Sequence, residues 1–193
     1  MLRVQCFLAL FTVTVAHESL DDKFWDLGVA EQLGRAEDAK LPVTKGKLPA
    51  WLQGTYVLGG PSQFRVGKRH VNHLFDGFAR ISSFKFEQEQ EVIFSSRMME
   101  SKWYNNSIRK DDVAPQFLMN QTTPPRLSDR VPMLNALAPN DNNIVFPLRM
   151  NETTYWYLSD SETRLEWDPA SLRITGELHS ASPITCAAHH LIL

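Results

Sequence analysis

The sequence has few cysteines, no long apolar run and no cluster of basic residues. Only two cysteines occur in 193 residues, Cys6 and Cys186. Because Cys6 falls in an N-terminal stretch that resembles a leader, Cys186 stands alone in the mature chain and no internal disulfide is expected. The net charge of -2 and the absence of basic runs interleaved with aromatic residues argue against nucleic acid as a partner.

The first sixteen residues predict a secretory signal peptide. Arg3 provides a short positive start, residues 4–15 are mostly apolar, and Ala16 ends a small-residue cleavage pattern. The apolar run is too short for a stable membrane span. A buried N-terminal strand or helix is the alternative interpretation of this segment.

Three glycosylation sequons agree with a secretory route. They begin at Asn105, Asn120 and Asn151, and each has a serine or threonine two positions later with no proline between. We therefore expect a glycoprotein that is secreted or resides in the lumen of the secretory pathway.

Beyond the leader, the chain changes from a charged arm to a series of β-strands. Residues 17–45 predict a short helix or an extended arm that ends near Pro42. Glycines and proline at 59–61 predict a turn, and Asn151-Glu152 predicts a two-residue hairpin turn. Prolines break residues 110–143, which predicts an irregular, exposed loop. The expected strands cover residues 54–58, 79–86, 92–98, 143–150, 153–158, 165–167 and 172–178.

Repeated short strands without a convincing long helix indicate an all-β protein. Sandwich, barrel and propeller all fit such a pattern, and periodicity alone does not choose among them.

Several ordered motifs resemble the carotenoid cleavage oxygenase family. The run LPAWLQG at 48–54, the Gly-Pro at 60–61 and the HLFDG at 73–77 resemble its N-terminal signature in residues and spacing. The animal carotene oxygenases and the retinal pigment epithelium isomerohydrolase are the members that the chain most resembles. One local departure is Leu58-Gly59, where the family usually has Arg-Asn. Later features follow in the family's order at residues 141–142, 155–160 and 167–172, so the resemblance extends from residue 46 to about residue 189.

The resemblance implies a seven-bladed β-propeller that holds Fe(II) on its central axis. In the family, four histidines bind the iron, glutamates orient three of them, and dioxygen splits a double bond of a carotenoid or apocarotenoid. Neutral imidazoles suit Fe(II), and incomplete coordination leaves room for dioxygen. We therefore expect a partial propeller in residues 46–193, after a signal peptide at 1–16 and an arm at 17–45. Association with a membrane surface is a further expectation.

The resemblance assigns the first iron ligand to His189. In the family this ligand lies in an Ala-His-Pro-His-like segment, whose place is taken here by Ala188-His189-His190. His190 stands where proline is usual, and Leu191 stands where a second histidine would be. Without the resemblance, a surface or terminal histidine is the simpler interpretation of His189.

Asp160 matches the glutamate of the family's Thr-Glu-Thr segment, which orients an iron-bound histidine. Aspartate is one methylene shorter than glutamate, and a solvated turn aspartate is the alternative interpretation. His70 and His73 have a spacing typical of metal pairs, but the resemblance assigns this region a structural role. We expect His73 to pack and to form hydrogen bonds within a blade.

The sequence also predicts what this polypeptide does not do alone. It ends at Leu193, soon after the first expected ligand, so we expect a fragment, a truncated isoform or an incomplete gene model that does not cleave carotenoids by itself. The alternative is a secreted, non-catalytic β-domain that binds an apolar ligand or a protein partner. The aromatic side chains available for such binding are Trp51, Trp103, Trp156 and Trp167.

Overall fold

The computed structural model describes residues 35–88, 91–130, 141–142, 145–159 and 163–179. The expected signal peptide and Cys186 fall outside these ranges. The described strands are β1 (Ala36–Pro42), β2 (Gly54–Gln63), β3 (Arg65–Val66), β4 (Arg69–His70), β5 (Phe78–Gln88), β6 (Glu91–Met98), β7 (Phe146–Arg149), β8 (Tyr155–Leu158), β9 (Thr163–Asp168) and β10 (Arg173–His179). The described helices are α2 (Lys102–Lys110) and the 3-10 turns η2 (Leu74–Asp76) and η3 (Leu127–Arg130).

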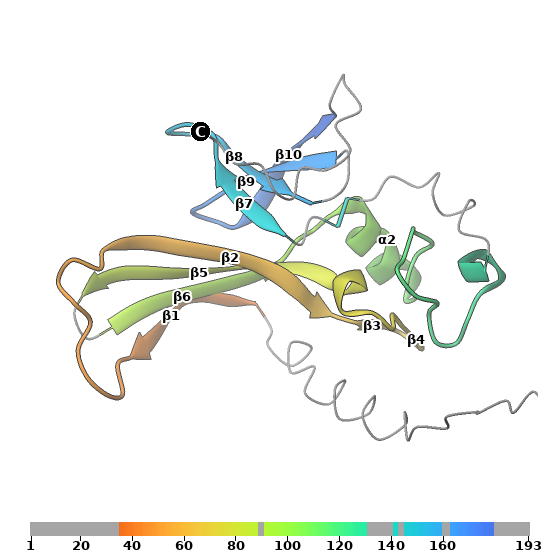
Figure 1. Ribbon diagram of the computed structural model, residues 1–193, viewed down its shortest axis with the longest axis horizontal. Coiled ribbons are helices and arrows are strands. Elements are labelled where there is room, and N and C mark those ends of the chain that lie inside the picture. The colour runs from red at the N-terminus through yellow and green to blue at the C-terminus, as the bar shows by residue number, and fades with distance from the viewer. Residues whose placement is uncertain (1–34, 89–90, 131–140, 143–144, 160–162, 180–193) are drawn as a thin grey trace, which may run out of the picture.

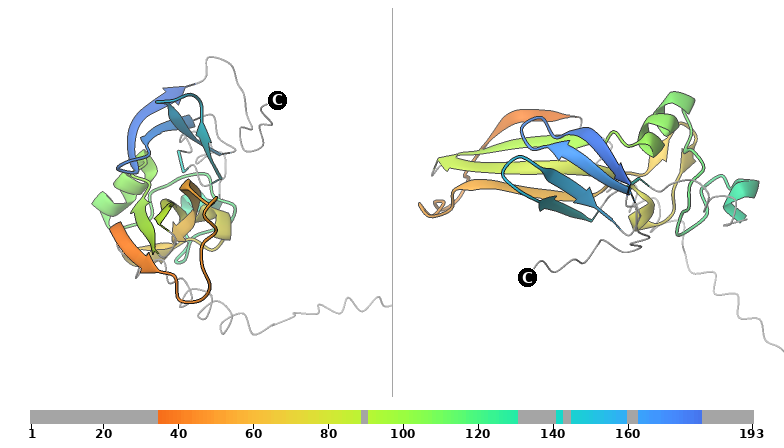
Figure 2. Two further views of the ribbon diagram at one scale, coloured as in Figure 1. Left: turned by 90° about the vertical axis from the view of Figure 1, so that its left-hand side faces the viewer. Right: turned by 90° about the horizontal axis from the view of Figure 1, so that it is seen from above.

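Two four-stranded antiparallel sheets dominate the described part of the chain. The first sheet has the order β1-β6-β5-β2, the second has the order β10-β9-β8-β7, and β3 and β4 form a small separate ribbon. The second sheet lies over one face of the first, with α2 and the β3-β4 ribbon at one end (Figures 1 and 2). Strands β2 and β7 contact each other across this junction. The expectation of a mainly β protein is confirmed.

The central hairpin of the first sheet forms as its sequence predicts. β5 pairs with β6 in antiparallel register, with Phe84 opposite Phe94 and their ring centroids 4.9 Å apart. The arm was predicted to be either helical or extended, and residues 36–42 are extended. They form β1, which pairs with β6 on the side opposite β5. The arm therefore contributes the outer strand of this sheet.

The turn predicted at residues 59–61 is wrong. Gly59, Gly60 and Pro61 continue strand β2 and pair with Ile81, Arg80 and Ala79 of β5. A proline is tolerated here because β2 is an edge strand, where a missing backbone N–H costs no ladder hydrogen bond on the open side. The register shifts just after it, between Pro61 and Gln63.

A short helix, α2, follows the first sheet where the strand pattern predicts none. Ser101 caps its N-terminus by accepting a hydrogen bond from the backbone N–H of Tyr104 at 3.1 Å. Asp111 ends the helix in a left-handed conformation with φ of 49°. Arg109 and Lys110 in the last turn complement the helix dipole.

The proline-rich segment after α2 is only partly exposed, because several of its side chains pack against the fold. Val113, Gln116 and Thr122 are buried. Asp141 and Asn142 are also buried. The prediction of an exposed excursion is therefore wrong for these residues, because polar side chains supply the hydrogen bonds that regular structure would otherwise provide.

The turn between β7 and β8 is longer than predicted. The backbone N–H of Met150 donates to the carbonyl of Thr154 at 2.9 Å, which leaves residues 151–153 to connect the strands. The two-residue turn at Asn151-Glu152 is therefore wrong. The absence of glycine explains this, since two-residue hairpin turns need positive φ values that non-glycine residues rarely adopt.

Two apolar clusters hold the layers together. The first joins the sheets and contains Ala79, Ile81, Met99, Tyr157, Leu165, Trp167 and Leu172. The second fills the space beneath α2 and contains Phe64, Val66, Val71, Phe78, Trp103, Val113 and Ala114. In the second cluster, the rings of Phe78 and Trp103 stack with centroids 4.0 Å apart.

Candidate functional site

The two side chains that the resemblance assigns to an iron site, His189 and Asp160, lie outside the described residues. Within the described ranges, no three or more His, Cys, Asp or Glu side chains form a group that could hold a metal ion. This part of the chain therefore does not fit an iron site by itself. The polar side chains in these ranges instead hold loops and a helix in place, as their hydrogen bonds show.

The HLFDG segment is a structural element, as its sequence predicts. His73 precedes η2, and its Nδ1 accepts a hydrogen bond from the backbone N–H of Phe75 at 3.2 Å. His70 lies in β4, where its backbone exchanges hydrogen bonds of 2.9 and 2.8 Å with Thr123. The structural interpretation of His73 is confirmed, although it caps a 3-10 turn and does not lie in a strand.

Asp76 of the same segment anchors the loop that follows α2. Its carboxylate accepts hydrogen bonds from the backbone N–H groups of Met119 at 2.8 Å and Asn120 at 3.1 Å. Burial raises the pKa of this carboxyl, and the two backbone hydrogen bonds oppose the rise. Gly77 is required next to it, since a Cβ there would lie 2.5 Å from the Phe64 ring.

Asp141 and Asn142 bind the end of the same excursion to the first sheet. The Asp141 carboxylate accepts hydrogen bonds from the backbone N–H groups of Lys102 at 2.5 Å and Trp103 at 3.2 Å, so it caps α2. The Asn142 amide accepts from the backbone N–H of Ala79 at 2.9 Å and donates to the Gly77 carbonyl at 2.8 Å. These two residues therefore hold helix, hairpin and loop together.

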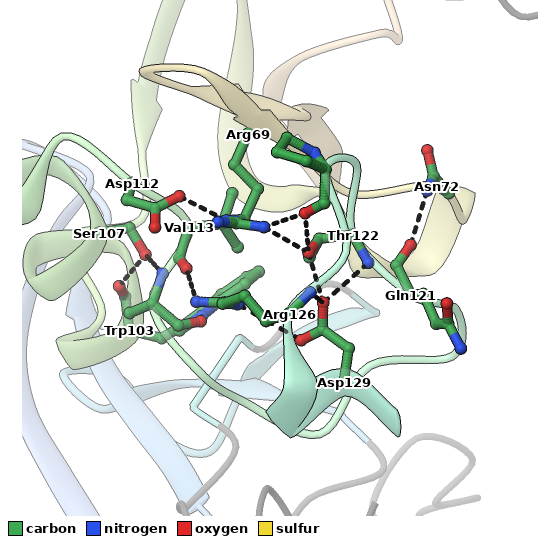
Figure 3. A network of polar contacts seen from close by, with 12 residues as sticks. Arg69, Asn72, Trp103, Ser107, Asp112, Val113, Gln121, Thr122, Arg126 and Asp129 are labelled. Carbon is green, nitrogen blue, oxygen red and sulfur yellow. Dashed lines mark hydrogen bonds and ion pairs between the residues drawn. The ribbon is translucent and has the colours of Figure 1, made fainter. Parts of the chain in front are cut away.

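A third group of charges lies between the β3-β4 ribbon and the proline-rich loop (Figure 3). Arg69 pairs with Asp112 at 2.7 Å and donates to Thr122 Oγ1 at 3.2 Å. Asp129 accepts from the hydroxyl and the backbone N–H of Thr122, and it pairs with Arg126 at 3.4 Å. Two arginines and two aspartates balance in charge, so the cluster clamps the loop and has no excess charge to bind a substrate.

A cleft of about 730 Å³ opens between the two sheets. Its walls are mixed in character, with Val57, Ile93 and Leu148 beside the charged groups of Asp38 and Lys85. Tyr155 and Trp167 also line it, and their rings meet edge to face at 5.4 Å. The volume of the cleft falls in the range of small-molecule sites. Its charged side chains already have partners, since Lys85 pairs with Glu87 at 2.6 Å, Asp38 accepts from Ser95 at 3.1 Å, and Arg149 donates to the Asn151 carbonyl at 3.0 Å.

The junction of the sheets depends on a close contact between Gly59 and Tyr157. A Cβ at Gly59 would lie 0.9 Å from the Tyr157 hydroxyl and 2.2 Å from its Cζ. Tyr157 is fully buried, and burial raises the pKa of its phenol. The absence of a side chain at Gly59 therefore makes room for a ring from the opposite sheet.

The asparagines of all three sequons are exposed on the described surface. Asn105 lies on α2, Asn120 lies in the loop anchored by Asp76, and Asn151 lies in the β7–β8 turn. The serine or threonine of each sequon lies in different surroundings, buried in the first two and exposed in the third.

Comparison with known proteins decides the family. The family model described as retinal pigment epithelial membrane protein matches residues 30–192. The chain belongs to the carotenoid cleavage oxygenase family. This family includes human β,β-carotene 15,15'-dioxygenase, to which the chain is 40% identical over 77 residues, covering 40% of this chain and 14% of that protein. It also includes the chloroplastic carotenoid cleavage dioxygenase 8 homolog A of rice, 28% identical over 181 residues, covering 81% of this chain and 31% of that protein.

Solved structures show the same fold. A mutant of the Synechocystis apocarotenoid oxygenase matches with a TM-score of 0.64 and 20% identity over 80% of this chain and 31% of that one. A chimera of that enzyme with RPE65 matches with a TM-score of 0.60 and 20% identity over 77% of this chain and 30% of that one. The chain thus spans less than a third of these relatives, corresponding to an N-terminal portion of the family's propeller. Among the described residues, no helix is long and apolar enough to cross a membrane.

Sequence reasoning missed the anchoring roles of Asp76, Asp141 and Asn142. The sequence identified all three as parts of family motifs but did not indicate what they bind. A buried aspartate next to a predicted turn has the same local signature as a solvated one, because the amide groups that it binds are about 40 residues away. Ser101 was the available signal for α2, since serine is a preferred N-cap.

Proposed function

We propose that this chain forms the N-terminal scaffold of an Fe(II)-dependent carotenoid oxygenase. The complete enzyme would use dioxygen to cleave a double bond of a carotenoid or apocarotenoid. The match of residues 30–192 to the family model carries this proposal. The two face-to-face antiparallel sheets support it, since they have the size and strand number of propeller blades.

The roles in this proposal divide between scaffold and metal. Asp76, Asp141 and Asn142 hold the loop and helix against the first sheet, and Tyr157 holds the second sheet on it. The His189 imidazole would supply one iron ligand, and Fe(II) when bound would supply the site where dioxygen reacts. In a longer protein that supplies the remaining ligands, replacing His189 with Ala should lower iron content without changing the unfolding midpoint, whereas replacing His73 with Ala should affect stability alone.

The 193-residue chain should not hold iron in the family's manner by itself. It contains six histidines. The two with described side chains, His70 and His73, lie in the β3-β4 and η2 region, and the described residues include no group of side chains that could hold a metal ion. We therefore propose that the isolated chain is inactive. Iron analysis of the purified chain and chromatography of β-carotene incubated with it test this, and stoichiometric iron together with turnover would contradict it.

A chimera tests the scaffold role separately. Residues 46–104 of this chain would replace the corresponding part of human β,β-carotene 15,15'-dioxygenase, a relative that is 40% identical over 77 residues. Bacteria that accumulate β-carotene should lose colour and gain a cleavage product when they express this chimera. A chimera that folds and binds iron but leaves β-carotene intact would contradict the proposed scaffold role.

The alternative, a secreted β-domain that binds an apolar ligand, is favoured by one observation, the cleft between the sheets. Under this alternative, the purified chain should shift the absorbance of an added apocarotenoid without consuming it. Replacing Val57 or Leu148 with Asp should abolish that shift, because a charge in the apolar wall costs several kcal/mol to desolvate. Absence of any shift leaves the oxygenase scaffold as the better account.

We further propose a location and a surface contact. Entry into the secretory pathway is supported by the pattern of residues 1–16, and N-terminal sequencing of secreted protein tests cleavage after Ala16. An exposed apolar patch on η2 and the adjoining loop could contact a lipid surface, as aromatic and aliphatic side chains do at membrane interfaces. The patch contains Leu74, Phe75, Phe117 and Met119.

Vesicle flotation tests the surface contact. Replacing Phe75 and Met119 with Ser should reduce the fraction of protein that floats with phosphatidylcholine vesicles. The matched control is Trp51→Ser, which removes an 81% exposed aromatic from the loop between β1 and β2 at the far end of the sheet (Figure 1). Equal loss in both variants would contradict a specific patch.

A further inference from the structure

The three sequons differ in whether the folded protein leaves the acceptor hydroxyl accessible. Ser107, which follows Asn105, is 0% exposed, and its hydroxyl donates to the Trp103 carbonyl at 2.8 Å and accepts from the Ala114 N–H at 2.9 Å. This hydroxyl is fully engaged within the second apolar cluster. Reaching it would require α2 to unwind.

The second sequon is closed in a similar way. Thr122, which follows Asn120, is 1% exposed, and its hydroxyl donates to Asp129 at 2.5 Å within the charged cluster of Figure 3. Asn120 is itself held by its backbone N–H, which donates to Asp76. Opening this sequon would break the Asp76 and Asp129 contacts together.

The third sequon is open. Asn151 and Thr153 are both exposed in the β7–β8 turn. The Asn151 Oδ1 accepts hydrogen bonds from the backbone N–H groups of Thr153 at 2.9 Å and Thr154 at 2.8 Å, and from the Thr153 hydroxyl at 3.2 Å. The side chain thus folds back over its own sequon in an Asx turn, with acceptor amide and hydroxyl adjacent.

We propose that Asn151 is the sequon at which the folded protein accepts an N-linked glycan, and that Asn105 and Asn120 are closed to modification once folding is complete. The donor is an oligosaccharide on a lipid pyrophosphate. The Asn151 carboxamide nitrogen bonds to C1 of the first sugar, the bond from C1 to the pyrophosphate oxygen breaks, and the amide loses one proton. This inference rests on the proposed secretory route.

A glycan at this position is compatible with the fold. In the described part of the chain, the Asn151 Nδ2 donates no hydrogen bond, so modification breaks none. By contrast, the Asn105 Nδ2 donates to the Glu100 carbonyl at 2.9 Å. A glycan on Asn120 would also stand beside Met119 in the exposed apolar patch, where it would block any lipid contact.

Transfer to purified protein tests the inference directly. The full chain, made without glycans, is incubated with oligosaccharyltransferase and lipid-linked oligosaccharide, once folded and once unfolded in urea that is then diluted. Peptide mass spectrometry should find the folded chain modified at Asn151 and the unfolded chain modified at all three positions. Modification of folded chain at Asn105 or Asn120 to the same extent as at Asn151 overturns the proposal.

Variants provide a second measurement. In the transfer to the folded chain, N151Q and T153A should each abolish the glycosidase-sensitive mobility shift, whereas T153S should retain it and N105Q and N120Q should leave the Asn151 glycan in place. In secretory cells, a version with an added, known leader separates the Asn151 site from the proposed secretory route. If only the version with the added leader carries the glycan, the native leader does not direct secretion, but the Asn151 site is supported. If the version with the added leader enters the lumen without a glycan at Asn151, the Asn151 site is overturned.

Discussion

Replacing Gly59 with Ala should specifically destabilise the junction between the two sheets. The new Cβ would be placed 0.9 Å from the Tyr157 hydroxyl, which must retreat by about 2.5 Å to reach an ordinary contact of 3.4 Å. Tyr157 has no free space for that movement, because it is fully buried within the cluster that includes Leu165 and Trp167. The clash is therefore relieved only by separating the sheets or by moving the ring off its rotamer.

The expected cost follows from known effects of overpacking. Forced side-chain and backbone shifts in a packed core cost about 1–3 kcal/mol. The size of the overlap puts Gly59→Ala near the upper end, at about 3 kcal/mol. Replacing glycine with alanine in a strand returns roughly 0.5–1 kcal/mol through a less flexible unfolded chain. The net loss in free energy of unfolding should therefore be about 2 kcal/mol.

Gly60 provides a matched control in the same strand. A Cβ at Gly60 would meet nothing within 4 Å, so Gly60→Ala should be neutral or stabilise by about 0.5 kcal/mol. Denaturant unfolding of the two variants, followed by near-ultraviolet circular dichroism of the buried aromatics, measures the difference. Equal stability of the two variants would refute the packing explanation.

A double-mutant cycle makes the test independent of backbone effects. Tyr157→Leu alone should cost about 3 kcal/mol, since it removes buried volume. In the Tyr157→Leu background, Gly59→Ala should cost nothing, because the atoms that it overlaps are gone. A coupling energy of at least about 1 kcal/mol is expected between the two positions, and strict additivity would show that they do not interact.

Three further predictions concern the anchoring residues and the buried phenol. Asp141→Ala should lower the free energy of unfolding by about 2 kcal/mol and reduce helical circular dichroism, because α2 loses a cap. The control is Glu152→Ala at an exposed turn, which should change the free energy of unfolding by less than about 0.5 kcal/mol. Asp76→Ala should make the loop around Met119 sensitive to limited proteolysis, and a cleavage rate equal to wild type would show that the carboxylate does not hold it. Burial raises the pKa of the Tyr157 phenol, so above about pH 10 the native state keeps a proton that the unfolded state loses. The free energy of unfolding should therefore fall as the pH rises above about 10. Tyr157→Phe should remove that part of the fall in a denaturant titration, and an unchanged slope would contradict the assignment.

Local pattern was sufficient to predict β2 and β5 to β10 but not their extent, and it did not predict β3 or β4. The alternation of Phe84 and Phe86 with polar residues predicts β5, and the apolar run that starts at Val92 predicts β6. Pattern failed at Gly59-Gly60-Pro61, because the packing that requires a glycine at position 59 is set by a distant part of the chain. Tyr157, almost 100 residues later, occupies the space of a side chain at Gly59.

The same limit applies to the candidate site. Motif order indicated the family, which comparison confirmed, because a spaced series of motifs carries more information than any one of them. The role of each polar residue was less predictable, since a carboxylate's partners are set by tertiary contacts. Asp76 illustrates this: its motif is evident in the sequence, but its two amide partners become neighbours only when the loop after α2 folds back.

The described carboxylates that lie deepest all bind backbone amides of the same chain. Asp76 and Asp141 each accept two, and burial raises the pKa of both, so each anchor carries an electrostatic cost that its hydrogen bonds offset. Groups committed in this way cannot also orient a metal ligand without releasing a loop or a helix. The chemistry of the family must therefore come from residues other than these. The decisive test therefore falls on His189, in a longer protein that supplies the remaining ligands. There, a loss of iron without loss of fold in His189→Ala is the outcome that would separate a ligand from a scaffold residue.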